Sequence, residues 1–134
     1  MINLEMLRQI NATANFNQWL GLEVDSVGEG EVTLSLVWRE ELGQYSGFLH
    51  AAIIGGLIDT ACGFAAATVA GPKVLASNFT VNCLRPAVGK KFIVKAVVVK
   101  AGKTQIFTTC DLFALHEGIE KLVANGQTIL TIAS

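Results

Sequence analysis

The chain lacks any excess of charge of one sign. Its 134 residues include ten Lys and Arg against eleven Asp and Glu, and charged residues make up 16% of the total. No basic stripe therefore indicates nucleic acid as a partner. An anionic ligand would have to be bound by a few local cations.

Cysteine is scarce and irregularly placed. The three cysteines, Cys62, Cys83 and Cys110, are odd in number and have neither metal-type nor redox-type spacing. This pattern favours free, buried thiols in a cytoplasmic protein. The sequence predicts no metal site and no cofactor.

A secretory signal is also missing, because residues 1–5 show no basic region followed by an apolar run. The apolar stretch at residues 51–70 is long enough to span a bilayer. However, Asp59 at its centre would cost about 2.5–3.5 kcal/mol on insertion, and no Lys or Arg flanks the stretch closely. We therefore expect a helix buried in protein and no membrane partner.

Hydrophobic residues, in contrast, are abundant and make up 51% of the chain. This content excludes disorder and is sufficient for a sizeable core. No internal repeat, linker or low-complexity segment divides the sequence. We expect one domain over residues 1–134.

The apolar periodicity predicts one long helix among strands. Residues 1–20 contain one or two short helices, which Gly21 ends. Residues 22–27 and 31–38 form a predicted hairpin. Residues 39–48 form a loop that leads to the long helix.

Strand-like runs follow the long helix without interruption. They are separated by short turns and cover residues 74–84, 91–100, 104–115 and 121–132. Short connections predict an antiparallel meander. Because a helix that is apolar all round must be enclosed, we expect an α+β fold in which one curved sheet of about six strands wraps the helix.

This pattern resembles the hotdog fold, and the sequence is similar to the small single-domain acyl-coenzyme A (acyl-CoA) thioesterases of that fold, the phenylacetate-pathway type. The similarity covers residues 20–132. Its most specific part is a loop that ends in His50 and is followed nine residues later by Asp59. Residues 82–87 and 100–104 also resemble a strand end and a hairpin of the family. The resemblance implies a thioester hydrolase.

The start of the long helix suits that chemistry on physical grounds. Its first amides, those of Ala51 and Ala52 among them, have no intrahelical acceptor and carry the positive end of the helix dipole. They could stabilise a thioester carbonyl oxygen, which becomes negative when a nucleophile adds. Asp59 would supply the base or the nucleophile.

The spacing of His50 and Asp59 predicts an oligomer. Nine residues place them roughly 13 Å apart along the helix axis and on opposite helix faces. They cannot act on one carbonyl within a single chain. If both act, the protein is an obligate homodimer with two sites at the interface. The resembled family is often a dimer of dimers.

The resemblance also assigns roles to single residues. Asp59 matches the catalytic carboxylate; the alternative is an aspartate bound by strand hydroxyls, but an unpaired buried carboxylate is costly without a purpose. His50 matches a histidine that orients the loop and the acyl group, or is a helix cap. Gln44 matches an Asn or Gln that could hold the thioester or the water, or is a solvated loop residue.

The chain departs from the family pattern at three places. Ala51 and Ala52 replace a glycine pair, so two methyl groups stand where the family backbone approaches the ligand. Gly63 stands where some members have Ser or Thr. A further Ser or Thr position falls on Ala76, while the neighbouring Ser77 is expected to face the other side of the sheet and is a weak candidate for a substrate contact.

Cations near the two turns after residue 84 could bind the phosphates of coenzyme A. The alternative is an ordinary solvated surface. The main candidates are Arg85, Lys90 and Lys103, beside Lys91 and Lys100.

Two other arrangements are set aside. Cys62 lies near Asp59 on the helix but has no nearby His, which argues against a Cys-His nucleophile. Asp111 and His116 have the spacing of the hydratase branch of the same fold. In that branch the motif starts the central helix, whereas here it ends a strand.

Two functions remain open. The first is hydrolysis of an acyl-CoA or aryl-CoA thioester by Asp59 and the helix amide across a dimer interface. The second is a non-catalytic acyl-CoA-binding or regulatory protein, which the Ala51-Ala52 pair makes plausible.

Overall fold

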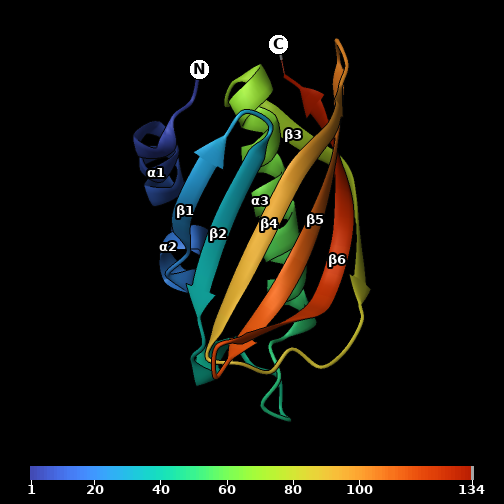
Figure 1. The fold of residues 1–134 in the computed structure, drawn as a ribbon. Coiled ribbons are helices and arrows are strands. Elements are labelled where there is room, and N and C mark those ends of the chain that lie inside the picture. Colours follow the sequence, from blue (N-terminus) through green and yellow to red (C-terminus); the bar gives the residue numbers. More distant parts are fainter. Residues whose placement is uncertain (134) are drawn as a thin grey trace.

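The computed structural model describes residues 1–133 and places one long helix against a single antiparallel sheet (Figure 1). The helices are α1 (Leu4–Thr13), α2 (Asn15–Leu20) and α3 (Ala51–Ala70), with a short 3₁₀ turn at Glu40–Leu42. The strands are β1 (Glu23–Gly28), β2 (Glu31–Val37), β3 (Val74–Cys83), β4 (Lys91–Ala101), β5 (Gln105–His116) and β6 (Ile119–Ile132). The α+β class, the six strands and the short N-terminal helices are confirmed.

The strand order differs from the predicted meander. The sheet runs β1-β2-β4-β5-β6-β3, so β4, β5 and β6 form the meander and β3 pairs with β6 at the edge. The meander prediction is therefore wrong for β3. The reason is the segment 84–90, which is no hairpin turn. It passes the start of α3, where the Leu49 N–H donates to the Ala87 carbonyl. The Trp38 N–H, just after β2, donates to the Lys90 carbonyl where the chain enters β4.

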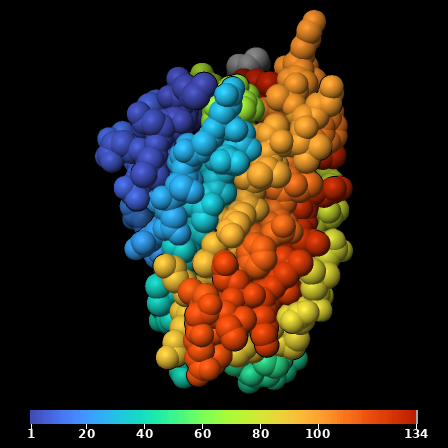
Figure 2. Space-filling view, viewed as in Figure 1, coloured from blue at the N-terminus to red at the C-terminus, as the bar shows by residue number. Residues whose placement is uncertain are grey.

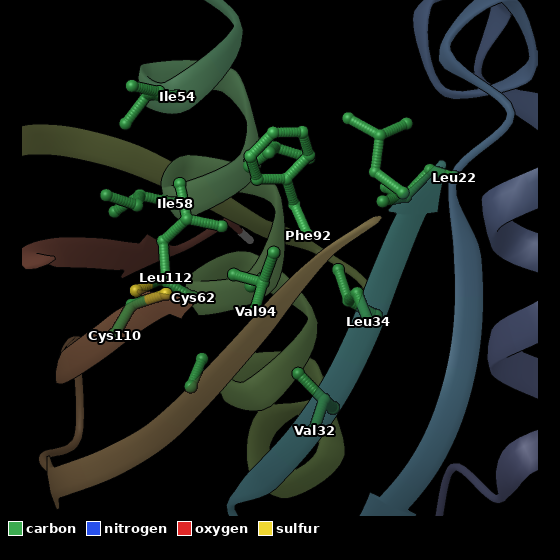
Figure 3. Close-up of a cluster of buried hydrophobic side chains, with 14 of the residues drawn as sticks. Leu22, Val32, Leu34, Ile54, Ile58, Cys62, Phe92, Val94, Cys110 and Leu112 are labelled. Atoms are coloured by element: carbon green, nitrogen blue, oxygen red, sulfur yellow. The ribbon is translucent and has the colours of Figure 1, made fainter. Parts of the chain in front are cut away.

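The sheet-facing side of α3 forms the centre of the core. Its apolar residues recur with helical spacing and are all buried: Ile54, Leu57, Ile58, Ala61, Cys62 and Ala65. Figure 3 shows Ile58 of α3 beside Leu112, with Phe92 and Val94 nearby. The helix is long and apolar enough to cross a membrane. It is, however, the core helix of this fold, and 56% of its most apolar 18-residue stretch is buried.

The opposite side of α3 remains partly open. Six residues there are half-buried and form a continuous stripe, hereafter the open stripe: Gly55, Gly56, Asp59, Thr60, Gly63 and Phe64. The sheet wraps the helix as predicted, but it covers one side and leaves this stripe free of strands. Phe16 of α2 covers Gly56, and Phe79 of β3 approaches Gly55.

Strand β3 lies beside this stripe and has no partner on its outer edge within the described chain. Most of its residues are exposed, including Leu75 (68%) and Phe79 (48%). Figure 2 shows the outward face of the sheet, with β3 in yellow-green along one margin. A long apolar edge of this kind is a template for pairing with another chain.

Candidate active site

The loop before α3 presents Gln44 and His50 on one side of the molecule. Gln44 N–H donates to the Phe48 carbonyl at 2.8 Å, and the Gln44 side-chain oxygen accepts from the Ser46 N–H. This compact turn places the Gln44 side chain beside the start of α3. Both side chains line a pocket of about 430 Å³, hereafter the His50 pocket, together with Ala51, Ile54, Arg85 and Ala87.

His50 caps the first turn of α3. Its Nδ1 accepts from the Ala52 N–H at 2.9 Å, so a neutral ring carries its proton on Nε2 and can donate into the pocket. The capping alternative is thus observed. It does not exclude the other predicted role, because the Nε2–H stays available to a ligand.

The same bond separates the roles of the first two amides of the helix. The Ala52 N–H is occupied by His50, whereas the Ala51 N–H has no hydrogen-bond partner within residues 1–133. Ala51 therefore supplies one amide donor at the positive end of a long helix, beside a pocket. That donor is suited to a developing oxyanion.

Asp59 lines a second, separate space, a cavity of about 330 Å³ between α3, β3 and the N-terminal helices, hereafter the Asp59 cavity. Apart from Asp59 itself its walls are mostly apolar. They include Ile10, Ala14, Asn17, Phe64, Ala76 and Leu130.

The electrostatics of Asp59 fit a functional carboxylate. Burial beside apolar groups raises the pKa of Asp59 above its usual range. Among the described residues, no side chain or backbone group hydrogen-bonds its carboxylate. The structure therefore contradicts the alternative in which strand hydroxyls bind the Asp59 carboxylate. A half-buried carboxylate without a partner, in a cavity, is a candidate general base.

Comparison with known proteins places the chain in a family. Residues 46–120 match the family model of the thioesterase superfamily. The chain belongs to the thioesterase superfamily. A thioesterase family protein from Silicibacter pomeroyi is 35% identical, with a TM-score of 0.90 over 93% of each chain. Human acyl-coenzyme A thioesterase 13 is 28% identical over 92% of this chain and 89% of its own length.

The fold of the superfamily is confirmed as well. The zebrafish thioesterase superfamily member 2 has a TM-score of 0.87 at 23% identity, over 99% of this chain and all of its own. The architecture of one long helix against a six-stranded antiparallel sheet is thus the hotdog fold. Thioester hydrolysis is the chemistry that these relatives support.

Within this chain the predicted catalytic residues fall into two groups. Gln44, His50 and Ala51 meet in the His50 pocket, and Asp59 lies in the other cavity. The two spaces share no lining residue. The His50 cap and the helix start at Ala51 agree with the spacing argument that one chain does not bring both halves together.

The predicted substrate contacts are spread more widely. Arg85 lines the His50 pocket, and Ala52 is exposed beside it. Lys90 and Lys103 flank opposite ends of β4, which at about 3.4 Å per residue are too far apart to serve one ligand in one chain. These assignments stay predictions.

Ser77 lies at a β-bulge between Ala76 and Asn78. The bulge breaks the strict alternation from which its orientation was predicted. Its hydroxyl donates to the Ile129 carbonyl at 3.2 Å, and Ser77 is exposed. Ala76, next to it, lines the Asp59 cavity.

Sequence reasoning missed the contribution of the N-terminal helices to the Asp59 cavity. Ile10, Ala14 and Asn17 form one of its walls. The signal available was Asn17, a polar residue among the apolar positions Phe16, Trp19 and Leu20 of the second short helix.

Two of the three thiols cannot take part, whereas Cys83 is exposed and lines the His50 pocket, so the expectation of buried thiols is wrong for Cys83. Cys62 of α3 and Cys110 of β5 are buried free thiols that lie side by side (Figure 3). A hydrogen bond from Cys110 lowers the pKa of Cys62, but a wholly buried sulfur cannot meet a thioester. Over the part of the chain that the structure describes, no group of His, Cys, Asp and Glu is arranged to hold a metal.

Proposed function

We propose that this chain is an acyl-CoA thioesterase in which two subunits complete each site. One subunit contributes the Ala51 amide, and the other contributes Asp59. The observation that carries the proposal is the pair of unsatisfied groups, a helix N–H and a half-buried carboxylate, in two separate spaces of one chain. Membership in the thioesterase superfamily supports the reaction class.

Hydrolysis of the thioester would use the Asp59 carboxylate and the Ala51 amide in different roles. As a base, the Asp59 carboxylate takes a proton from water, and the hydroxide oxygen adds to the thioester carbon. The Ala51 N–H stabilises the oxyanion, and His50 Nε2–H and the Gln44 amide are placed to hold the thioester or the water. Collapse of the intermediate breaks the C–S bond, and the proton passes to the thiolate of coenzyme A. As a nucleophile, the Asp59 carboxylate would instead attack the carbon directly and expel the coenzyme A thiolate, and water would then hydrolyse the resulting anhydride to the free acid and return the carboxylate.

The open edge of β3 and the open stripe of α3 support a homodimer. Pairing through this face would bring the partner's helix start towards Asp59 and cover Leu75 and Phe79. Arg85 at the His50 pocket would bind a phosphate of acyl-CoA, and Lys90 and Lys103 would come from different subunits if both contribute. A dimer of dimers and a cytoplasmic location are parts of the same proposal.

Proline at position 51 gives a sharp test of the amide. Ala51 is the first residue of the helix, where proline is tolerated, and His50 has φ −64° and ψ 139°, which suits a residue before proline. Ala51→Pro thus deletes the proposed donor without breaking the helix. We expect kcat with acyl-CoA to fall about 10²- to 10³-fold. Ala51→Ser, which keeps the N–H, is the matched control.

Mixed dimers test the shared site. Ala51→Pro and Asp59→Asn homodimers should each be nearly inactive. Co-refolding the two gives heterodimers with one intact site and one doubly altered site, so about a quarter of the wild-type activity should return. If each chain held a whole site, no activity would return, and the two-subunit proposal would be wrong.

The Ala51 and Ala52 methyl groups favour a second candidate, a non-catalytic acyl-CoA-binding protein. It predicts binding of acetyl-, medium-chain, long-chain and aryl-CoA without release of free thiol. A steady-state thiol assay over this panel separates the two. Binding without turnover across the whole panel would replace the enzyme proposal by this one.

A further inference from the structure

The N-terminal helices carry one buried polar side chain into the Asp59 cavity. Asn17 of α2 is 7% exposed and lines that cavity with Ile10 and Ala14. A buried amide needs partners for both of its ends. The surrounding bonds show which end is satisfied.

A chain of hydrogen bonds fixes the orientation of the Asn17 amide. Asn11 Nδ2 donates to the Leu22 carbonyl at 2.8 Å, so the Asn11 oxygen is the end that faces Asn17. Asn17 Nδ2 donates to that oxygen at 3.0 Å. The Asn17 oxygen is therefore the remaining end, and no donor among the described residues reaches it.

This leaves a hydrogen-bond acceptor in a cavity that is otherwise mostly apolar and that contains Asp59. The cavity, about 330 Å³, lies at the small end of the range for ligand sites. Its size suits a short or medium acyl group. Its free acceptor suits a group on that acyl chain that donates a hydrogen bond.

We propose that the Asp59 cavity binds the acyl group and that Asn17 selects acyl groups that carry a hydroxyl. The inference rests on the thioesterase function proposed above and names its substrate class. A hydroxyl on the chain would donate to the Asn17 oxygen, while an unsubstituted chain would leave that acceptor desolvated and unpaired. Sites built around such a bond discriminate against the analogue that lacks it.

Matched substrates test the selection. The kcat/KM of wild-type protein is measured with hexanoyl-, heptanoyl- and octanoyl-CoA and with their terminally hydroxylated derivatives, which do not readily form a five- or six-membered lactone. We expect at least one hydroxylated substrate to be preferred about tenfold. Asn17→Leu should bring that ratio close to one, and Asn17→Asp, which keeps an acceptor oxygen, should retain a preference. Ile10→Ala is the control, because it enlarges the cavity and leaves the Asn17 oxygen in place.

A binding measurement separates this inference from the failure of catalysis. Thioether analogues of the same acyl-CoA pairs cannot be hydrolysed, and their affinities for Asp59→Asn protein are measured by calorimetry. A tenfold tighter binding of a hydroxylated analogue, lost in the Asp59→Asn, Asn17→Leu double variant, supports the inference even if no substrate turns over. Equal affinities within every pair, or no binding of any analogue, would overturn it.

Discussion

The two sides of α3 differ in packing although they belong to one helix. The sheet-facing side is fully buried and lined by Ile54, Leu57, Ile58 and Cys62. The open stripe carries three glycines, Thr60, Phe64 and the one carboxylate of the helix, all half-buried. Most residues of the open stripe line the Asp59 cavity, whereas these sheet-facing residues do not.

The sheet-facing side of α3 therefore serves mainly the stability of the fold, and the open stripe serves mainly the chemistry of the site. Close packing on the sheet side holds the helix in place, and small residues on the open side leave room for a ligand or a partner chain. Substitutions on the sheet side should therefore change mainly the free energy of unfolding. Substitutions on the open stripe should change mainly activity.

The largest expected effect is on the open stripe, at Asp59. Asp59→Asn keeps the size of the side chain and removes the base or nucleophile. We therefore expect kcat/KM to fall about 10²- to 10⁴-fold. In wild-type protein, kcat/KM should rise with pH through the raised pKa of Asp59 and then level off, because the carboxylate form is the active one. Unchanged turnover in Asp59→Asn would remove Asp59 from the mechanism.

The same substitution should stabilise the fold at neutral pH. Burial raises the pKa of Asp59 above its usual 3.8, so the folded chain binds this proton more tightly than the unfolded chain. The free energy of unfolding then falls as pH rises from 3.8 through the raised pKa of Asp59, and it stays lower at higher pH. Asp59→Asn should raise Tm at pH 7, and the two proteins should converge below pH 3.8. A lower Tm at pH 7 would contradict the sign of the shift.

On the sheet side, Ile58→Ala should reduce stability strongly. Ile58 is wholly buried and its Cγ2 approaches Gly126 of β6. Its truncation should lower the free energy of unfolding by about 2–5 kcal/mol, as urea denaturation would measure. Thr60→Ala on the open stripe is the matched control, expected within about 0.5 kcal/mol. Similar losses for both would erase the distinction between the two sides.

The sequence was sufficient for much of the fold because its signals were local. The all-apolar run ended at Gly71, and period-two alternation located the strands. The place of β3 was not predictable from such signals, because segment 84–90 has turn-like composition but leads from β3 at the sheet edge to β4 in the interior of the sheet, with β5 and β6 between them. Pairing between distant strands depends on long-range packing that a local pattern does not record.

The candidate site was predictable where one element defines it. The cap at His50 and the spacing to Asp59 follow from the helix alone. The surroundings of Ser77 could not be derived from alternation alone, because a bulge interrupts the alternation at that position. The proposed role of Asn17 also depends on tertiary structure, since its free oxygen follows from Asn11 and from a cavity that α1, α3, β3 and β6 help to form.

A smaller effect tests the space beside Asp59. A Cβ on Gly63 would lie 3.7 Å from Leu130 Cδ2, an ordinary contact, so Gly63→Ala should add about 0.5–1 kcal/mol of stability through helix propensity. It should also narrow the Asp59 cavity and lower kcat/KM for larger acyl groups. Gly126→Ala is the contrast, because its Cβ would lie 2.3 Å from the Thr80 carbonyl and force β3 away from β6. A destabilised Gly63→Ala protein would show that the open stripe is packed more tightly than described.

A last pair of variants distinguishes two buried hydroxyls behind α3. Thr108 and Thr128 face each other on β5 and β6, and the Thr108 hydroxyl donates to the Thr128 carbonyl at 2.8 Å. The Thr128 hydroxyl is buried beside the Cys62 thiol and has no nitrogen or oxygen partner within the described chain. Thr108→Val should therefore cost about 1 kcal/mol, whereas Thr128→Val should be neutral or stabilising by up to about 1 kcal/mol, because it removes an unsatisfied polar group. Thermal unfolding of the two single variants measures the difference, and an equal loss in both would show that the Thr128 hydroxyl is satisfied in solution.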